Sequence, residues 1–60
     1  MNNFIPFKLL DTGGEEVIIN TNYILYVLPL DTVHSQITMR DGTTINLEES
    51  VDEVDVEFNI

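Results

Sequence analysis

Apolar residues in this chain recur in short runs separated by turn residues, a pattern typical of a small β protein. The first run, Phe4–Leu10, contains Pro6. Because proline donates no backbone hydrogen bond, we expect an edge strand or a strand entry there. A turn with two glycines follows at 11–14, and the β-branched segment Val17–Ile19 predicts the next strand.

The most hydrophobic segment is Tyr23–Leu28, and Pro29 ends it. Its consecutive apolar residues leave no polar face, so we expect both faces of this strand to be covered. Either a second subunit covers one face, or the strand is central and buried within one subunit. A chain this short has little material to cover both faces, which favours the second subunit. Residues 30–34 form a loop.

A β-hairpin is the clearest local signal. Two alternating segments, 35–40 and 43–48, flank Asp41-Gly42, the favoured central pair of a type I′ turn. One face of this hairpin should carry Ile37, Met39, Ile45 and Leu47, and the other Gln36, Thr38, Arg40, Thr44, Asn46 and Glu48.

The C-terminal stretch fits two structures. Ser50 and Glu53 have the spacing of a capping box, which favours a short helical turn over Val51–Val54. The alternation of Val54 and Val56 also fits an extended continuation. Residues 1–60 are therefore predicted to form one mainly β domain, a small antiparallel sheet or half-barrel of four to five strands with a short C-terminal helical turn.

The size of the chain makes assembly an issue. A protein of 60 residues buries only about 60% of its unfolded surface, so its own core is marginal. It has no cysteine and one histidine, so neither disulfides nor thiolate zinc sites can stabilise it. Yet 43% of its residues are hydrophobic. We therefore predict a homo-oligomer.

Charge narrows the range of partners. Lys8 and Arg40 stand against eleven acidic residues, which gives a formal net charge of −9. Such a chain repels nucleic-acid phosphates and anionic lipid, so we expect no direct nucleic-acid or membrane partner. No stretch has the roughly 18 apolar residues of a membrane span, and the N-terminal residues lack a signal-peptide pattern, so we expect a cytoplasmic protein.

Several short motifs occur in a fixed order along the chain: Gly14–Asn20, Ile24–Val27, Asp31-Thr32, Ile37–Met39, Asp41-Gly42 and Glu49–Val54. This order resembles that of the FlbD/SwrD-type small flagellar proteins. The resemblance implies a small β fold and a flagellar or regulatory adaptor role. The chain differs from the family at Thr43-Thr44, where members usually carry basic residues.

Catalytic chemistry has little basis in the sequence. Asp31, His34 and Ser35 are the residue types of a catalytic triad, but residues adjacent in one loop do not easily converge as a triad requires. The acidic stretch Glu48–Glu57 lacks the central glycine of a calcium loop. We therefore expect no enzyme activity, cofactor or metal site.

Four residues are candidates for a subunit interface or a ligand site. Arg40 and Lys8 have the chemistry to surround an anion between subunits. Tyr23 and Tyr26 fall on opposite faces if they share a strand, so at least one of them should meet an interface or a pocket, and we favour Tyr26.

We therefore expect a non-enzymatic interaction module, an acidic β homo-oligomer that binds a basic protein surface. The residues expected to contact the partner are Glu49, Asp52, Glu53, Asp55 and Glu57. The alternative is a phage-type counter-defence protein that sequesters a small nucleotide ligand between subunits or inhibits a host protein, including by DNA mimicry.

Overall fold

A computed structural model describes residues 3–58 of the chain, with side chains described as far as Glu57. The expectation about the N-terminal start depends partly on Met1 and Asn2, which lie outside this range. The described part is mainly β, as the sequence predicts, and none of its helices is long and apolar enough to cross a membrane. The elements in chain order are β1 (Phe4–Lys8), β2 (Glu16–Asn20), the 3-10 turn η1 (Thr21–Tyr23), β3 (Ile24–Pro29), β4 (Ser35–Met39), β5 (Thr44–Leu47) and α1 (Val51–Phe58).

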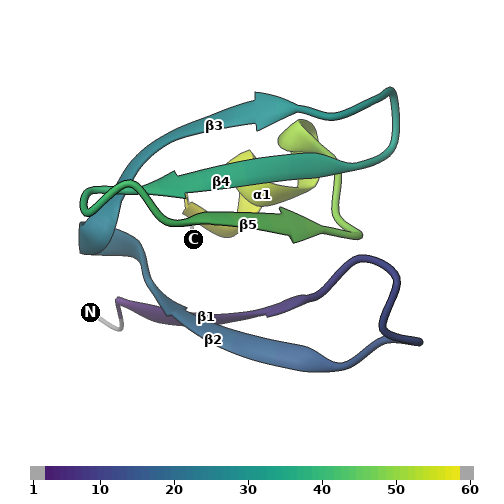
Figure 1. Ribbon diagram of the computed structural model, residues 1–60, viewed down its shortest axis with the longest axis horizontal. Coiled ribbons are helices and arrows are strands. Elements are labelled where there is room, and N and C mark those ends of the chain that lie inside the picture. Colours follow the sequence, from purple (N-terminus) through teal and green to yellow (C-terminus); the bar gives the residue numbers. More distant parts are fainter. Residues whose placement is uncertain (1–2, 59–60) are drawn as a thin grey trace.

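Two antiparallel sheets, β1-β2 and β3-β4-β5, meet where β1 ends beside β5 (Figure 1). A bridge pairs Leu9 with Leu47, and the Leu10 N–H donates to the Asn46 carbonyl at 3.0 Å. The strands therefore follow one another in space as β2-β1-β5-β4-β3. This arrangement agrees with the predicted small antiparallel sheet and leaves β2 and β3 at its two ends.

The core lies between the strands and α1, which packs against β3. Each fully buried aliphatic or aromatic side chain stabilises the fold by about 1.5–3 kcal/mol, so a few such residues account for much of the stability of a small domain. The buried apolar residues are Phe7, Ile19, Ile24, Ile37, Leu47 and Val54.

The β4-β5 hairpin forms where the sequence predicts it, but its turn is not type I′. The Gly42 N–H donates to the Met39 carbonyl at 3.0 Å, and the Thr43 carbonyl accepts the Met39 N–H at 2.7 Å. Gly42 has φ +93°, whereas Asp41 is not among the residues with positive φ. A type I′ turn needs positive φ at both positions, so this is a three-residue loop with Gly42 as a bulge residue. The predicted division of the hairpin into two faces is confirmed, because Ile37 pairs with Ile45.

The C-terminal helix is longer than the predicted single turn. α1 covers eight residues, so the extended continuation over Val56 is wrong. The capping box is confirmed: the Glu53 N–H donates to Ser50 Oγ at 3.2 Å, and the Ser50 N–H donates to Glu53 Oε1 at 3.1 Å. Because this box satisfies two N-terminal N–H groups and Val54 anchors the helix in the core, the helix extends past its first turn.

β3 is an edge strand, so the expectation that it is central and buried within one subunit is wrong. In this strand Ile24 is buried and Val27 is half-buried, but Leu25, Tyr26 and Leu28 are 55%, 48% and 48% exposed. The single chain thus covers only one side of its most hydrophobic segment. The alternative cover, a second subunit, remains a prediction.

Candidate interaction surface

The exposed apolar residues of β3 form the first part of the candidate site. Tyr26 is paired in register with Thr38, and Leu28 with Gln36, so these two side chains stand on the outer face of the sheet beside polar neighbours. Thr38 is only 7% exposed, although it belongs to this outer face. The outer face of β3 is therefore an apolar strip at the edge of a polar sheet.

A groove between β3 and α1 forms the second part. Its narrow end is a space of about 170 Å³, and its open end is a hollow of about 480 Å³ beside the β3–β4 loop. Val51 lines both ends, so we treat them as one feature, the β3–α1 groove. The narrow end is lined by Val27, Val51, Val54 and Asp55.

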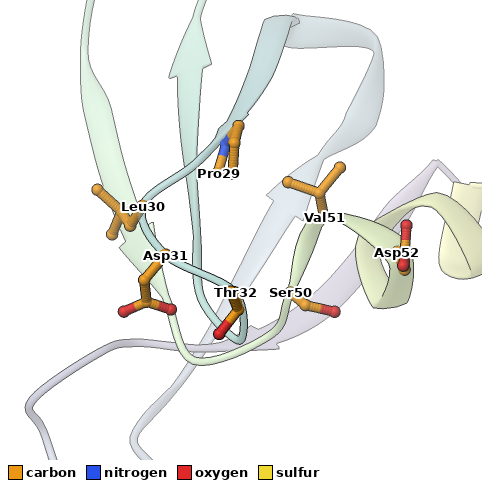
Figure 2. A pocket seen from close by; sticks show the side chains of 7 residues that line it. All are labelled: Pro29, Leu30, Asp31, Thr32, Ser50, Val51 and Asp52. Atoms are coloured by element: carbon orange, nitrogen blue, oxygen red, sulfur yellow. The ribbon is translucent and has the colours of Figure 1, made fainter.

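The hollow is lined by two segments that are far apart in the sequence (Figure 2). Each segment contributes both apolar side chains and side chains that carry oxygen atoms. Pro29 and Val51 lie above, the oxygen atoms of Asp31, Thr32 and Ser50 lie at the lower end, and Asp52 lies at the right at about the height of Val51. The complete lining is Pro29, Leu30, Asp31 and Thr32 from the loop, and Ser50, Val51 and Asp52 from the start of α1.

Asp31 and His34 hold the loop at the mouth of this hollow. Asp31 Oδ1 accepts the N–H groups of Val33 and His34, both at 2.8 Å, and His34 Nδ1 lies 2.8 Å from Asp31 Oδ2. The hydrogen bond from His34 lowers the pKa of Asp31, and the same bond raises the pKa of His34. Asp31 therefore stays anionic at the rim of the hollow.

Four of the five predicted partner-contact residues are exposed on α1: Asp52, Glu53, Asp55 and Glu57. Glu53 also closes the capping box, and the Glu49 carboxylate, half-buried before the helix, accepts the Lys8 backbone N–H at 3.1 and 3.2 Å. The surface of α1 next to the groove is thus acidic, and it contains no basic residue.

The structure does not bring Lys8 and Arg40 together within the protomer. The Lys8 carbonyl accepts the Glu48 N–H at the end of β5, whereas Arg40 is the first residue of the loop between β4 and β5, and its Nε donates to the Asn22 carbonyl at 3.0 Å. The anion site proposed for these two residues would therefore have to be formed by different subunits, which nothing here tests.

The two tyrosines do not share a strand. Tyr23 belongs to η1, and a register shift between Ile24 and Tyr26 interrupts the alternation of β3. The premise that Tyr23 and Tyr26 point to opposite faces of one strand is therefore wrong. Both side chains are about half exposed, at 47% and 48%, so an interface role remains a prediction for each.

Asp31, His34 and Ser35, the residue types of a catalytic triad, do not converge. Ser35 is fully buried, and its Oγ donates to the Glu49 carbonyl at 2.8 Å, while His34 faces Asp31. A serine held in this way is not positioned beside the imidazole as a nucleophile requires. Within residues 3–58, no three or more histidine, aspartate or glutamate side chains converge as a metal site requires.

The chain was compared with models of protein families, with curated proteins and with solved structures, and no match was found. The resemblance to FlbD/SwrD-type proteins therefore rests on the order of residues alone and remains a prediction.

Sequence reasoning identified the acidic side chains but not the groove beside them. The apolar spacing of Val51 and Val54 indicated a helix face, but the contact of this helix with β3 depends on how the chain folds back over the sheet. The available signal was the short distance in sequence between the hairpin and Ser50, which obliges the helix to return across the sheet.

Proposed function

We propose that this protein is a non-enzymatic interaction module that assembles through the outer face of β3 and binds a basic surface of another protein through α1. One observation supports it above all. The exposed residues Tyr26 and Leu28 lie on the edge strand against which the acidic helix packs. Apolar anchors give affinity, and neighbouring charges add speed and specificity of binding.

The apolar strip of β3 favours self-association. Adjacent half-exposed aromatic and aliphatic side chains on one strand are uncommon on a monomer and mark contact surfaces. No charged residue occurs between Tyr23 and Leu30, so two copies with a formal charge of −9 each meet there with the least repulsion. Face-to-face packing of the two outer faces also leaves the backbone edge of β3 unoccupied.

The acidic helix favours a basic protein partner over a nucleotide ligand. Asp31 and Asp52 line the hollow, and their charges repel phosphate groups. The nucleotide-sequestering alternative therefore gains no support from this surface. The order of motifs shared with FlbD/SwrD-type proteins supports an adaptor role.

The test compares two charge-reversal variants with the same net charge. The partner is first crosslinked to the wild-type protein in cells, identified, and purified. Its affinity is then measured at low and high salt for the α1 variant D52K/D55K/E57K and for the control variant E15K/E16K/E48K, all at exposed positions.

We expect the α1 variant to bind at least about tenfold more weakly and to lose most of the salt dependence, because the contacting charges are removed. The control should stay within about threefold of wild type, since distant exposed charges act mainly through screened long-range fields. Equal weakening in both variants would show that net charge alone matters, and the assignment to α1 would then be wrong.

A further inference from the structure

The outer edge of β3 presents backbone groups that β4 does not use. The Leu30 N–H donates to the His34 carbonyl at 3.0 Å, and the register pairs Leu28 with Gln36. Hydrogen-bonded and non-hydrogen-bonded pairs alternate along an antiparallel ladder, so the N–H and C=O of Val27 point away from β4. Within residues 3–58 no strand pairs with β3 on that side (Figure 1).

This open edge of β3 is short. The register shift between Ile24 and Tyr26 interrupts it at one end, and Pro29, which has no N–H, ends it at the other. Bulges and prolines are devices that protect edge strands from unlimited sheet extension. The backbone groups left open for pairing are the N–H and C=O of Val27, which point outward together, and the carbonyl of Pro29 two residues further on.

The β3–α1 groove lies directly under this edge. Its narrow end, lined by three valines and by Asp55, holds about 170 Å³, and an apolar cavity of about 150 Å³ is known to accept a benzene molecule, so one aliphatic side chain has room against the valines. The hollow at the other end lies beside Pro29 and carries Asp31 and Asp52 on opposite walls. The apolar space and the acidic hollow are thus offset by two residues along β3.

We propose that β3 binds an extended segment of another protein as an added antiparallel strand, and that this segment carries a basic residue two positions before an aliphatic one. The aliphatic side chain lies opposite Val27 and fills the valine-lined space. The basic side chain lies opposite Pro29, between Asp31 and Asp52. Residues two apart on a strand share a face and are about 6.6 Å apart, so side chains opposite Val27 and Pro29 face the two ends of the groove that these residues line.

Charge complementarity selects this occupant over a second copy of the chain. In an antiparallel pair of β3 strands, the incoming strand would bring only uncharged residues to the hollow. It would also bring a second acidic α1 close to the first, which is repulsive. A basic segment instead brings a cation to the hollow, where Asp52 is exposed and Asp31, already bonded to His34, adds a second negative charge. This inference rests on the proposed function, because it specifies how the basic partner is bound.

The test uses a short synthetic peptide, threonine–lysine–threonine–leucine–threonine with blocked ends, and follows the backbone amide signals of the protein by NMR. We expect binding with a dissociation constant below about 1 mM and shifts concentrated at Val27 and Val51. Replacing the lysine by glutamate, or the leucine by serine, should weaken binding at least about tenfold, because each removes one of the two recognised groups.

A pair of N-methylated peptides distinguishes strand addition from electrostatic attraction. In the proposed pairing the leucine N–H donates to the Val27 carbonyl, whereas the N–H of the following threonine points to solvent. Methylating the leucine nitrogen should weaken binding at least about tenfold, and methylating the threonine nitrogen should leave it within about twofold. On the protein side, D31N/D52N should weaken binding, and the control E15Q/E16Q should not.

Three outcomes would overturn strand addition. The first two are equal affinity of the two N-methylated peptides and no binding of the lysine–leucine peptide. The third is concentration-dependent shifts of the Val27 amide without peptide in Leu28→Lys, a variant that should not assemble through the outer face; such shifts would place a second copy on the edge. None of these bears on the α1 charge-reversal comparison, so the proposed function can survive the loss of this inference. If that comparison fails while the peptide tests succeed, β3 can bind a basic segment, but the partner captured in cells does not bind through α1.

Discussion

The Glu49 carboxylate accepts the backbone N–H of Lys8, with distances of 3.2 and 3.1 Å to its two oxygens. This contact joins residues 41 positions apart. It ties the end of β1 to the segment between β5 and α1, immediately before the capping box. A residue that sequence reasoning placed in a partner interface therefore also helps to fix the position of the helix that forms one wall of the groove.

Replacing Glu49 by alanine should destabilise the fold by about 1–2 kcal/mol, because hydrogen bonds to a charged group are stronger than neutral ones. The measurement is urea unfolding at neutral pH. Glu57→Gln is the control: an anion in the last turn of a helix is unfavourable, so its neutralisation should be neutral or slightly stabilising. Equal losses in the two variants would mean that the bond to Lys8 contributes nothing specific.

Ser50→Ala should lower the free energy of unfolding by about 1 kcal/mol, because Ser50 caps the Glu53 N–H. Helical circular dichroism should fall at the same time. Glu53→Gln keeps an oxygen that can accept the Ser50 N–H, so it should cost less than half as much. If Ser50→Ala leaves both stability and helicity unchanged, the capping box does not hold α1 in place.

Local patterns predicted the strands and the capping box because each depends on neighbouring residues. The alternation of Ile45 and Leu47 gave the buried face of β5, and the spacing of Ser50 and Glu53 gave the start of α1. The position of β3 was less predictable. Its apolar run fits a buried strand equally well, and only the pairing of distant segments decides that it lies at the edge.

The turn type was mispredicted for a related reason. Asp41-Gly42 fits both a two-residue and a three-residue loop, and the choice depends on which residues of β4 and β5 pair. Pairing Ile37 with Ile45 fixes the longer loop. Similarly, the β3–α1 groove arises from the long-range approach of Val27 to Val51 and Val54, to which only the short connection between the hairpin and Ser50 points in the sequence.

Gly42→Ala should destabilise the protein by about 1–2 kcal/mol, because a left-handed conformation is unfavourable for residues with a Cβ. Gly42 has φ +93° and nothing within 4 Å of an added Cβ, so the cost comes from the backbone and not from a clash. Gly42→Asn should cost less, since asparagine tolerates this region better. Thermal unfolding of both variants checks the order, and a reversed order would contradict the assigned loop.

The Asp31–His34 pair should give the protein a pH-dependent stability. The raised pKa of His34 means that its contribution is fully present below the ordinary value of 6.5 and is lost as pH rises through the higher folded pKa. The lowered pKa of Asp31 means that its contribution is present above the ordinary value of 3.8 and is lost as pH falls through the folded pKa. The Asp31–His34 pair therefore stabilises the fold fully between pH 3.8 and pH 6.5, and this stabilisation is lost outside that range on both sides.

An NMR titration of the His34 ring in wild type and in Asp31→Asn measures this coupling. The pKa of His34 should fall towards 6.5 in the variant, because the bond to Asp31 is the largest cause of its elevation. Glu48→Gln is the control, since Glu48 contributes a smaller effect from the end of β5. An unchanged His34 titration in Asp31→Asn would mean that the pair does not form in solution.

Leu28→Lys should convert the predicted oligomer to a monomer without unfolding it. Leu28 is 48% exposed in the protomer, so a lysine there reaches solvent when the chain is alone but places a buried charge in a face-to-face assembly. Thr44→Lys, an exposed change on the outer face of β5, adds the same charge away from β3 and should leave assembly intact. Sedimentation velocity at micromolar concentration measures the state of each protein, and circular dichroism verifies folding. If wild type itself sediments as a well-folded monomer, the exposed strip of β3 does not serve self-association.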